Sequence, residues 1–186
     1  YIHEDAKKEN ILDIVINSKV QRPGVCNALE TLLINSEIYQ DMGSQIIEEL
    51  LENDVELFVD AKIKEDYPNL NLANNLHYET EFLELKLAVK LVENDSQAIE
   101  HIKNYSSGHT DAILTESKEI ADNFAKSIDS SVIFINSSTR FTDGEMFGFG
   151  SEIGISTQKL HVRGPMGLEA LTNERYVVTG EGTVRK

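Results

Sequence analysis

Apolar residues along the chain recur in two spacings, one typical of helices and one typical of strands. Near the start, the spacing of Ile11, Ile14 and Val15 predicts a helix. We expect this helix to run over residues 5–20, with Asp5 as its N-cap. The same patterns predict helices over 41–51, 95–105 and 115–128, with Asp41 and Thr115 as caps, and strands over 28–34, 55–59, 85–92, 109–114 and 132–135.

This alternation of helices and strands predicts an α/β fold. Strands separated by helices of ten or so residues form βαβ units, in which helices cover both faces of a parallel sheet. Residues 62–78 are rich in Asn and predict a surface loop or weak edge structure. Residues 139–167 hold more than half of the chain's eleven glycines and predict a long functional loop. Residues 175–185 predict a β-hairpin that pairs with another segment or subunit, since a lone hairpin is marginally stable.

Composition and charge narrow the classes of partner. The chain has 186 residues, 40% of them apolar, and a formal net charge of −15, which fits about one globular domain. This negative charge argues against nucleic acid and anionic membranes as partners, since both are negatively charged and bind positively charged proteins. Cys26 is the single cysteine, so we expect no internal disulfide and a reducing, cytoplasmic compartment. The spacing of the five histidines predicts no dedicated metal site.

Two stretches of this acidic chain carry no carboxylate. The first, residues 14–29, holds Cys26 together with Lys19 and Arg22. Nearby cations lower the pKa of a thiol below about 8.5, so this setting favours a nucleophilic thiolate, whereas we expect Asn27 to be architectural. An inert, buried cysteine is the alternative. The second stretch, residues 153–168, has three basic side chains that could meet a phosphate or line a subunit interface, namely Lys159, His161 and Arg163.

The segment around Cys26 resembles a known family. Residues 21–31, QRPGVCNALET, are similar to the active-cysteine segment of glutamyl phosphate reductases, members of the aldehyde dehydrogenase superfamily. Further blocks resemble the same family in the same order, over residues 80–90, 98–102, 108–109, 136–144 and 147–169. Because these blocks run through most of the chain and the last two are long, the resemblance is specific.

The resemblance implies a reaction with a small-molecule substrate. It is the NADPH-dependent reduction of L-glutamyl 5-phosphate to L-glutamate 5-semialdehyde, in proline biosynthesis. The Cys26 thiolate would displace phosphate from the acyl carbon, and the thioester would then accept hydride from NADPH. Two alternatives stay open: an aldehyde-oxidising relative that hydrolyses its thioester, and a non-catalytic α/β assembly module.

The resemblance also implies roles for individual residues. Glu81 matches a glutamate that binds the hydroxyls of the nicotinamide ribose, and Leu83 matches the bulky apolar residue that follows it. A solvated glutamate is the alternative for Glu81. Arg140, followed by Phe141 and Thr142, is a candidate clamp for the substrate's α-carboxylate, because a guanidinium fork matches a carboxylate geometrically. A structural ion pair is the alternative for Arg140.

The family also predicts the organisation of the chain. We expect residues 1–165 to form the catalytic, cysteine-bearing domain of aldehyde dehydrogenase type, and residues 166–186 to form strands for assembly. Superfamily members associate through C-terminal strands like residues 176–179, which predicts a homo-oligomer. Family members are roughly twice as long, and the dinucleotide-binding domain that precedes this part is expected to be absent here. We therefore expect the isolated chain to bind NADPH poorly and to be inactive.

Overall fold

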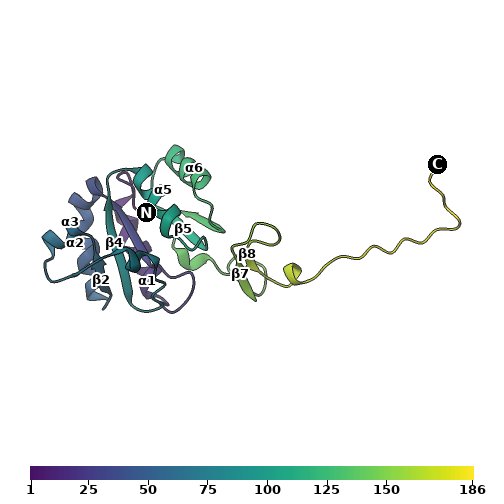
Figure 1. Ribbon diagram of the computed structural model, residues 1–186, viewed down its shortest axis with the longest axis horizontal. Coiled ribbons are helices and arrows are strands. Elements are labelled where there is room, and N and C mark those ends of the chain that lie inside the picture. The colour runs from purple at the N-terminus through teal and green to yellow at the C-terminus, as the bar shows by residue number, and fades with distance from the viewer.

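The computed structural model describes all residues from Tyr1 to Lys186 and shows an α/β domain followed by an extended C-terminal segment (Figure 1). The helices are α1 (Lys8–Val20), α2 (Ser36–Glu52), α3 (Ala61–Asp66), α4 (Asn75–Glu79), α5 (Asp95–Tyr105) and α6 (Lys118–Ser127), with short 3-10 turns η1 (Thr139–Phe141) and η2 (Glu169–Leu171). The strands are β1 (Thr31–Asn35), β2 (Glu56–Val59), β3 (Asn71–Leu72), β4 (Lys86–Val92), β5 (Thr110–Ile113), β6 (Val132–Ile135), β7 (Gly154–Ser156) and β8 (Gly164–Met166). None of the helices is long and apolar enough to span a membrane.

The central sheet is parallel and is assembled from two parts. Four strands pair in the order β1-β4-β2-β3, and β5 pairs with β6. The first residues of the chain join the parts, because Ile2 forms bridges to both Ile34 and Leu114. The N–H of Ile2 donates to the Leu33 carbonyl at 2.9 Å, and the N–H of His3 donates to the Leu114 carbonyl at 3.0 Å. The six parallel strands therefore lie in one layer.

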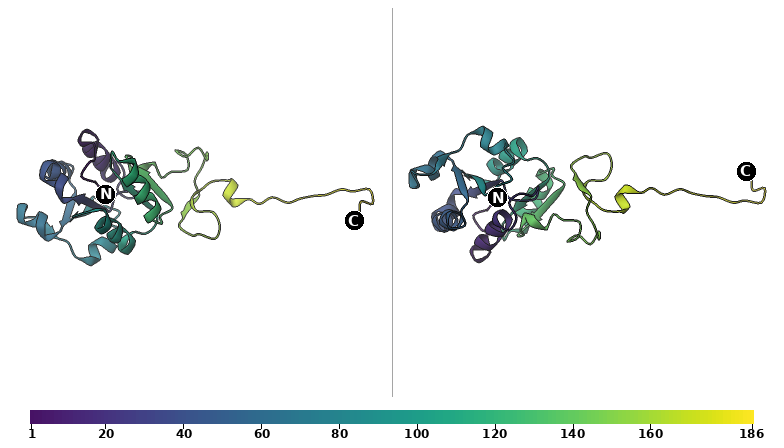
Figure 2. Two further views of the ribbon diagram at one scale, coloured as in Figure 1. Left: turned by 90° about the horizontal axis from the view of Figure 1, so that it is seen from above. Right: turned by 90° about the horizontal axis from the view of Figure 1, so that it is seen from below.

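Both faces of this layer are covered, as the residues of β1 show. Leu32 and Ile34 pack in a cluster with residues of α1, α2 and α3, whereas Leu33 packs with residues of α5 and α6. Successive residues of a strand point to opposite faces of its sheet, so the two groups of helices lie on opposite sides (Figure 2). The predicted α/β fold with a parallel sheet is confirmed.

Several predicted helix starts are wrong. Asp5 does not cap α1; its carboxylate accepts a hydrogen bond of 2.6 Å from the Thr115 hydroxyl. Asn35 caps α2, so Asp41 lies inside that helix, and Ser117 rather than Thr115 caps α6. Each region offers more than one side chain that can cap, and contacts with distant strands decide among them. Residues 62–78 are also more regular than predicted, since they contain β3 and most of α3 and α4.

The last residues of the chain form no hairpin. The antiparallel pair in this part of the structure is β7 with β8, inside the glycine-rich stretch, and residues 172–186 contain no strand. Val178 is 92% exposed, and Figure 1 shows this segment running away from the domain. A C-terminal antiparallel hairpin is therefore present, but it lies at β7 and β8 rather than over residues 175–185, which form no strand within the chain alone. Two isolated strands bury too little apolar surface to be stable without a further partner.

Candidate active site

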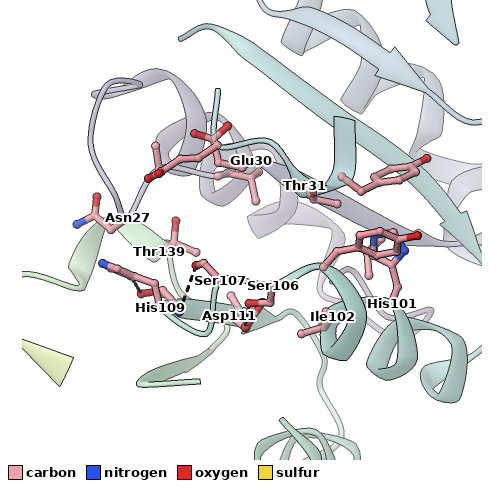
Figure 3. A pocket seen from close by; sticks show the side chains of 18 of the residues that line it. Asn27, Glu30, Thr31, His101, Ile102, Ser106, Ser107, His109, Asp111 and Thr139 are labelled. Carbon is pink, nitrogen blue, oxygen red and sulfur yellow. Dashed lines mark hydrogen bonds between the residues drawn. The ribbon is translucent and has the colours of Figure 1, made fainter. Parts of the chain in front are cut away.

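Cys26 lies on the loop between α1 and β1. Its side chain is exposed, and it lines a cavity of about 170 Å³. In Figure 3, Asn27 and Glu30 of the same loop lie on one side of this cavity, and His109, just before β5, lies on the other. The sulfur is therefore exposed, unlike the buried cysteine of the alternative.

Asn27 anchors the cysteine loop. Its side chain is buried, and its Nδ2 donates to the Thr142 carbonyl at 2.7 Å. Its Oδ1 accepts a hydrogen bond from the guanidinium of Arg140. Asn27 is therefore architectural, as predicted, and it fixes the position of Cys26 relative to η1.

Lys19 does not serve Cys26 as a neighbouring cation. It is fully buried, and its Nζ lies 3.0 Å from a carboxylate oxygen of Glu30. Burial lowers the pKa of Lys19 and raises the pKa of Glu30, in each case against the opposing effect of the partner's charge. The other Glu30 oxygen accepts the N–H of Leu83 at 3.2 Å. This ion pair therefore ties the cysteine loop to the segment that carries Glu81.

The pKa of the Cys26 thiol is raised, so the predicted low-pKa thiolate is wrong for this chain. Desolvation is the largest cause, and the negative charge of Glu152 is the next. Glu81 raises the pKa of the thiol further, whereas the Cys26 backbone N–H and the charge of Arg140 lower it. Two carboxylates that are distant in sequence face the sulfur, and Lys19 is engaged elsewhere.

Glu81 lies at the same cavity as Cys26, while Leu83 lies just beyond its lining. None of the hydrogen bonds in the structure involves the Glu81 carboxylate, so its oxygens are free to accept. Leu83 has a φ of 54°, in the left-handed region that is strained for a leucine. Strained backbone conformations of this kind cluster at functional sites. Here the hydrogen bond from the Leu83 N–H to Glu30 stabilises the conformation of Leu83.

Arg140 carries a charge that no carboxylate compensates. Its Nε donates to Gln21 at 2.7 Å and its Nη1 to Asn27, and both acceptors are neutral amides. None of the ion pairs in the structure includes Arg140, so the structural ion pair considered as an alternative is not present. The remaining N–H groups of this guanidinium are available near Cys26.

Phe141 and Thr142 follow Arg140 in the chain, and none of the three residues lines the cavity. Phe141 is exposed, whereas Thr142 is buried and its hydroxyl lies 2.8 Å from the Thr110 hydroxyl. The Thr142 carbonyl accepts the bond from Asn27 described above. Thr142 therefore supports the cysteine loop through its backbone.

The basic residues of the second acid-free stretch do not reach the cavity. Lys159 and Arg163 both pair with Asp129, the second at 2.8 Å, and His161 is exposed. These ion pairs dock the loop between β7 and β8 against the segment that precedes β6. The structure also brings together no group of three or more His, Cys, Asp or Glu side chains that could hold a metal ion.

Comparison with known proteins extends the resemblance to the whole chain. No family model matches it. The gamma-glutamyl phosphate reductase of Thermoanaerobacter pseudethanolicus is 50% identical over 186 residues, which cover 100% of this chain and 45% of that protein. The crystal structure of gamma-glutamyl phosphate reductase from Thermotoga maritima is similar with a TM-score of 0.93 and 46% identity, over 100% of this chain and 45% of that one. The chain is homologous along its whole length to gamma-glutamyl phosphate reductases.

The chain spans about half the length of the gamma-glutamyl phosphate reductases that it matches, 45% in both cases. A more distant likeness concerns the fold alone. Lactaldehyde dehydrogenase from Escherichia coli is similar with a TM-score of 0.58 and 14% identity, over 74% of this chain and 38% of that one. The domain therefore has the aldehyde dehydrogenase type of fold that the resemblance implied.

Two side chains at the site were not singled out from the sequence. His109 lines the cavity, and its Nε2 is buried without a hydrogen-bond partner; burial lowers the pKa of this imidazole, so it is uncharged at neutral pH. Glu152 is the charged group that most raises the pKa of Cys26. Both residues fall inside sequence blocks that resemble glutamyl phosphate reductases. The resemblance of those blocks was the sequence feature from which His109 and Glu152 could have been identified as site residues.

Proposed function

We propose that the chain carries the catalytic cysteine of an NADPH-dependent gamma-glutamyl phosphate reductase. The reaction reduces L-glutamyl 5-phosphate to L-glutamate 5-semialdehyde and releases phosphate, in proline biosynthesis. The observation that carries the proposal is the exposed sulfur of Cys26 at a cavity that Glu81 also lines. Because the chain spans 45% of its relatives' length, the activity is proposed for the whole protein.

Acyl transfer to Cys26 is the first chemical step of this proposal. The S–C bond forms as the C–O bond to phosphate breaks, and the thiol proton leaves with the phosphate. The raised pKa of Cys26 means that the resting thiol holds its proton at neutral pH, so removal of this proton is part of the step. The Cys26 N–H, which favours the thiolate, would also stabilise the oxyanion.

The residues at the cavity also fit a nicotinamide cofactor. When bound, NADPH supplies the hydride that reduces the thioester. The free carboxylate oxygens of Glu81 would accept hydrogen bonds from the ribose hydroxyls. Leu83 would offer its apolar side chain beside the ring, from a backbone that Glu30 holds in place.

Arg140 is the proposed receptor for the substrate's α-carboxylate. Its charge is uncompensated, and its remaining N–H groups match a carboxylate. Phe141, which is exposed, would contact the substrate beside Arg140, and Thr142 would support both residues through its bond to Asn27.

Residues 166–186 are proposed to serve assembly, and residues 1–165 to form the catalytic domain. The supporting observation is the exposure of Tyr176, Val177 and Val178, side chains typical of strands that lack a partner within this chain. We propose a homo-oligomer, with the chain acting in a reducing, cytoplasmic compartment that preserves the Cys26 thiol. The isolated chain would remain inactive without the rest of the protein.

Substitution of the nucleophile tests the proposal. In the full-length protein, Cys26→Ser is expected to lower the rate of acyl phosphate reduction roughly a thousandfold or more, because an alcohol is a far weaker nucleophile. Thermal unfolding of the variant, followed by circular dichroism, should match the wild type. A variant that keeps its activity would contradict the proposal. Wild-type protein that oxidises aldehydes to acids without phosphate would favour the aldehyde-oxidising alternative.

A further inference from the structure

Cys26 lies near two side chains of opposite charge that are unpaired within the chain. None of the ion pairs in the structure includes Arg140 or Glu152. Both charges act on the Cys26 sulfur: Glu152 raises the pKa of the thiol and Arg140 lowers it. A cation and an anion therefore stand free beside the nucleophile, and each lacks a counter-charge.

Short hydrogen bonds connect Glu152 to the cysteine loop. The side chain of Asn27, the neighbour of Cys26, donates a hydrogen bond of 2.7 Å to the Thr142 carbonyl. Two residues after Thr142, the N–H of Gly144 donates to Glu152 Oε2 at 2.8 Å. A Cβ on Gly144 would lie 2.7 Å from the Ser151 carbonyl oxygen, so only glycine lets the two ends of this loop meet.

One oxygen of the Glu152 carboxylate is thus committed to the loop and the other is not. Its Oε1 makes no hydrogen bond within the chain, and the side chain is exposed. The Oε1 atom of Glu152 therefore remains available as a hydrogen-bond acceptor with a negative charge.

We propose that Glu152 binds the α-ammonium group of the substrate while Arg140 binds its α-carboxylate, an inference that rests on the proposed function. An α-amino acid carries these two charges on one carbon, and three carbon–carbon bonds separate this carbon from the acyl carbon of a glutamyl group. One free cation and one free anion beside the nucleophile match this arrangement.

The sign of the charge supports this assignment. A carboxylate at this position opposes the chemistry in two ways, because it disfavours the Cys26 thiolate and repels an acyl phosphate. A substrate that brings its own cation removes both effects. A substrate without an amino group leaves Glu152 unpaired, so the same carboxylate works against such analogues.

Two aldehydes test the assignment in the full-length protein, assayed from aldehyde to acyl phosphate with NADP⁺ and inorganic phosphate. They are glutamate 5-semialdehyde and glutarate semialdehyde, which has the same chain without the amino group. Wild-type protein is expected to prefer the first by roughly tenfold to a hundredfold in kcat/KM, the usual range for one hydrogen bond between charged groups. This comparison needs no variant.

The variant Glu152→Gln then tests whether Glu152 is the source of the preference for glutamate 5-semialdehyde. Glutamine still accepts the Gly144 N–H and keeps the loop, but it lacks the charge. The variant should lose most of the preference, chiefly through a higher KM for glutamate 5-semialdehyde, while kcat/KM for glutarate semialdehyde stays level or rises. Glu145→Gln, which removes the same charge from an exposed position on the same loop, is the matched control and should keep the wild-type preference.

Equal losses for both aldehydes in Glu152→Gln would overturn the assignment, since Glu152 would then only hold the loop. So would a wild-type protein that uses the two aldehydes equally well. Wild-type protein that is inactive with both would instead refute the proposed function itself.

Discussion

Residues 1–135 and residues 143–186 differ in how they bury their apolar side chains. In the first region, side chains such as Ile34 and Phe124 are almost fully buried between the sheet and its helices. In the second region, Phe149 is 51% and Leu160 84% exposed. The first region folds around its own core, while the second lacks a core of its own. Yet each contributes to the site, since Cys26 belongs to the first and Glu152 to the second.

The difference teaches how this site divides its tasks. The nucleophile sits on a loop that a buried ion pair and Asn27 hold in place. The charge that most affects this nucleophile comes from a loop in the less buried region. Reactivity can therefore change through residues 143–152 without any change in the packing beneath Cys26.

The largest expected effect is on the free energy of unfolding, when a core side chain of the first region is removed. Phe124→Ala should lower the free energy of unfolding by about 3–5 kcal/mol, because it removes a side chain that is 1% exposed and leaves a cavity. Val178→Ala, in the second region, should change it by less than about 0.5 kcal/mol. Urea unfolding of the full-length protein measures both, and similar values for the two variants would contradict the comparison.

A smaller expected effect is the pH dependence of stability that arises from His101, in the first region. His101 is buried, and the ammonium of Lys90 can only donate to its Nδ1, at 3.3 Å, so Nε2 carries the proton. Burial, together with the Lys90 charge, lowers the pKa of His101 to about 4. Below its ordinary pKa of 6.5, the unfolded chain binds a proton that the folded chain does not.

Stability should therefore be lost as the pH falls from about 6.5 to about 4. The loss attributable to His101 is about 3 kcal/mol. Unfolding of wild type and His101→Gln over this range measures it, because the variant lacks the titrating group and should show a flatter dependence. Parallel curves for the two proteins would rule out this role for His101.

The smallest expected effect is on the pH profile of Cys26 alkylation, which depends on charges from outside the cysteine loop. The rate of thiol alkylation should rise with pH through a pKa above that of an ordinary thiol. Glu152→Gln should shift this profile to lower pH and Arg140→Gln to higher pH, because each removes a charge that acts on the sulfur. Iodoacetamide labelling followed by mass spectrometry gives the profiles. Superimposable profiles would mean that the second region does not reach the nucleophile.

Much of the first region could be predicted from the sequence. The bounds of α5 and β6 match the prediction, since α5 has a clear apolar period and β6 is a short, continuous apolar run. Helix caps failed where several polar residues compete, as at Asp5, whose carboxylate binds a residue more than a hundred positions away. Local patterns carry no information on such contacts.

Of the predicted site residues, the structure brings Cys26 and Glu81 to one cavity, whereas Leu83, Arg140, Phe141 and Thr142 lie outside its lining. Cys26, Glu81 and Arg140 were found through family-like blocks, and the structure brings the first two to one cavity. The direction of the Cys26 pKa shift was wrong because Lys19 is nearby in sequence but paired with Glu30, while Glu152 is remote in sequence and faces the sulfur. Charge spacing along a chain does not give distances in the fold.

The backbone at Ile2, which bridges β1 and the residue after β5, also affects the dimensions of the cavity. Leu33 of β1 and Ala112 of β5 both border the cavity, and the backbone of residues 1–3 is inserted between these two strands. Two strand spacings, about 10 Å in all, therefore separate the backbones of Leu33 and Ala112 at that point. The width is a property of the backbone, so exchanging wall side chains should alter which molecules the pocket prefers while its span stays constant.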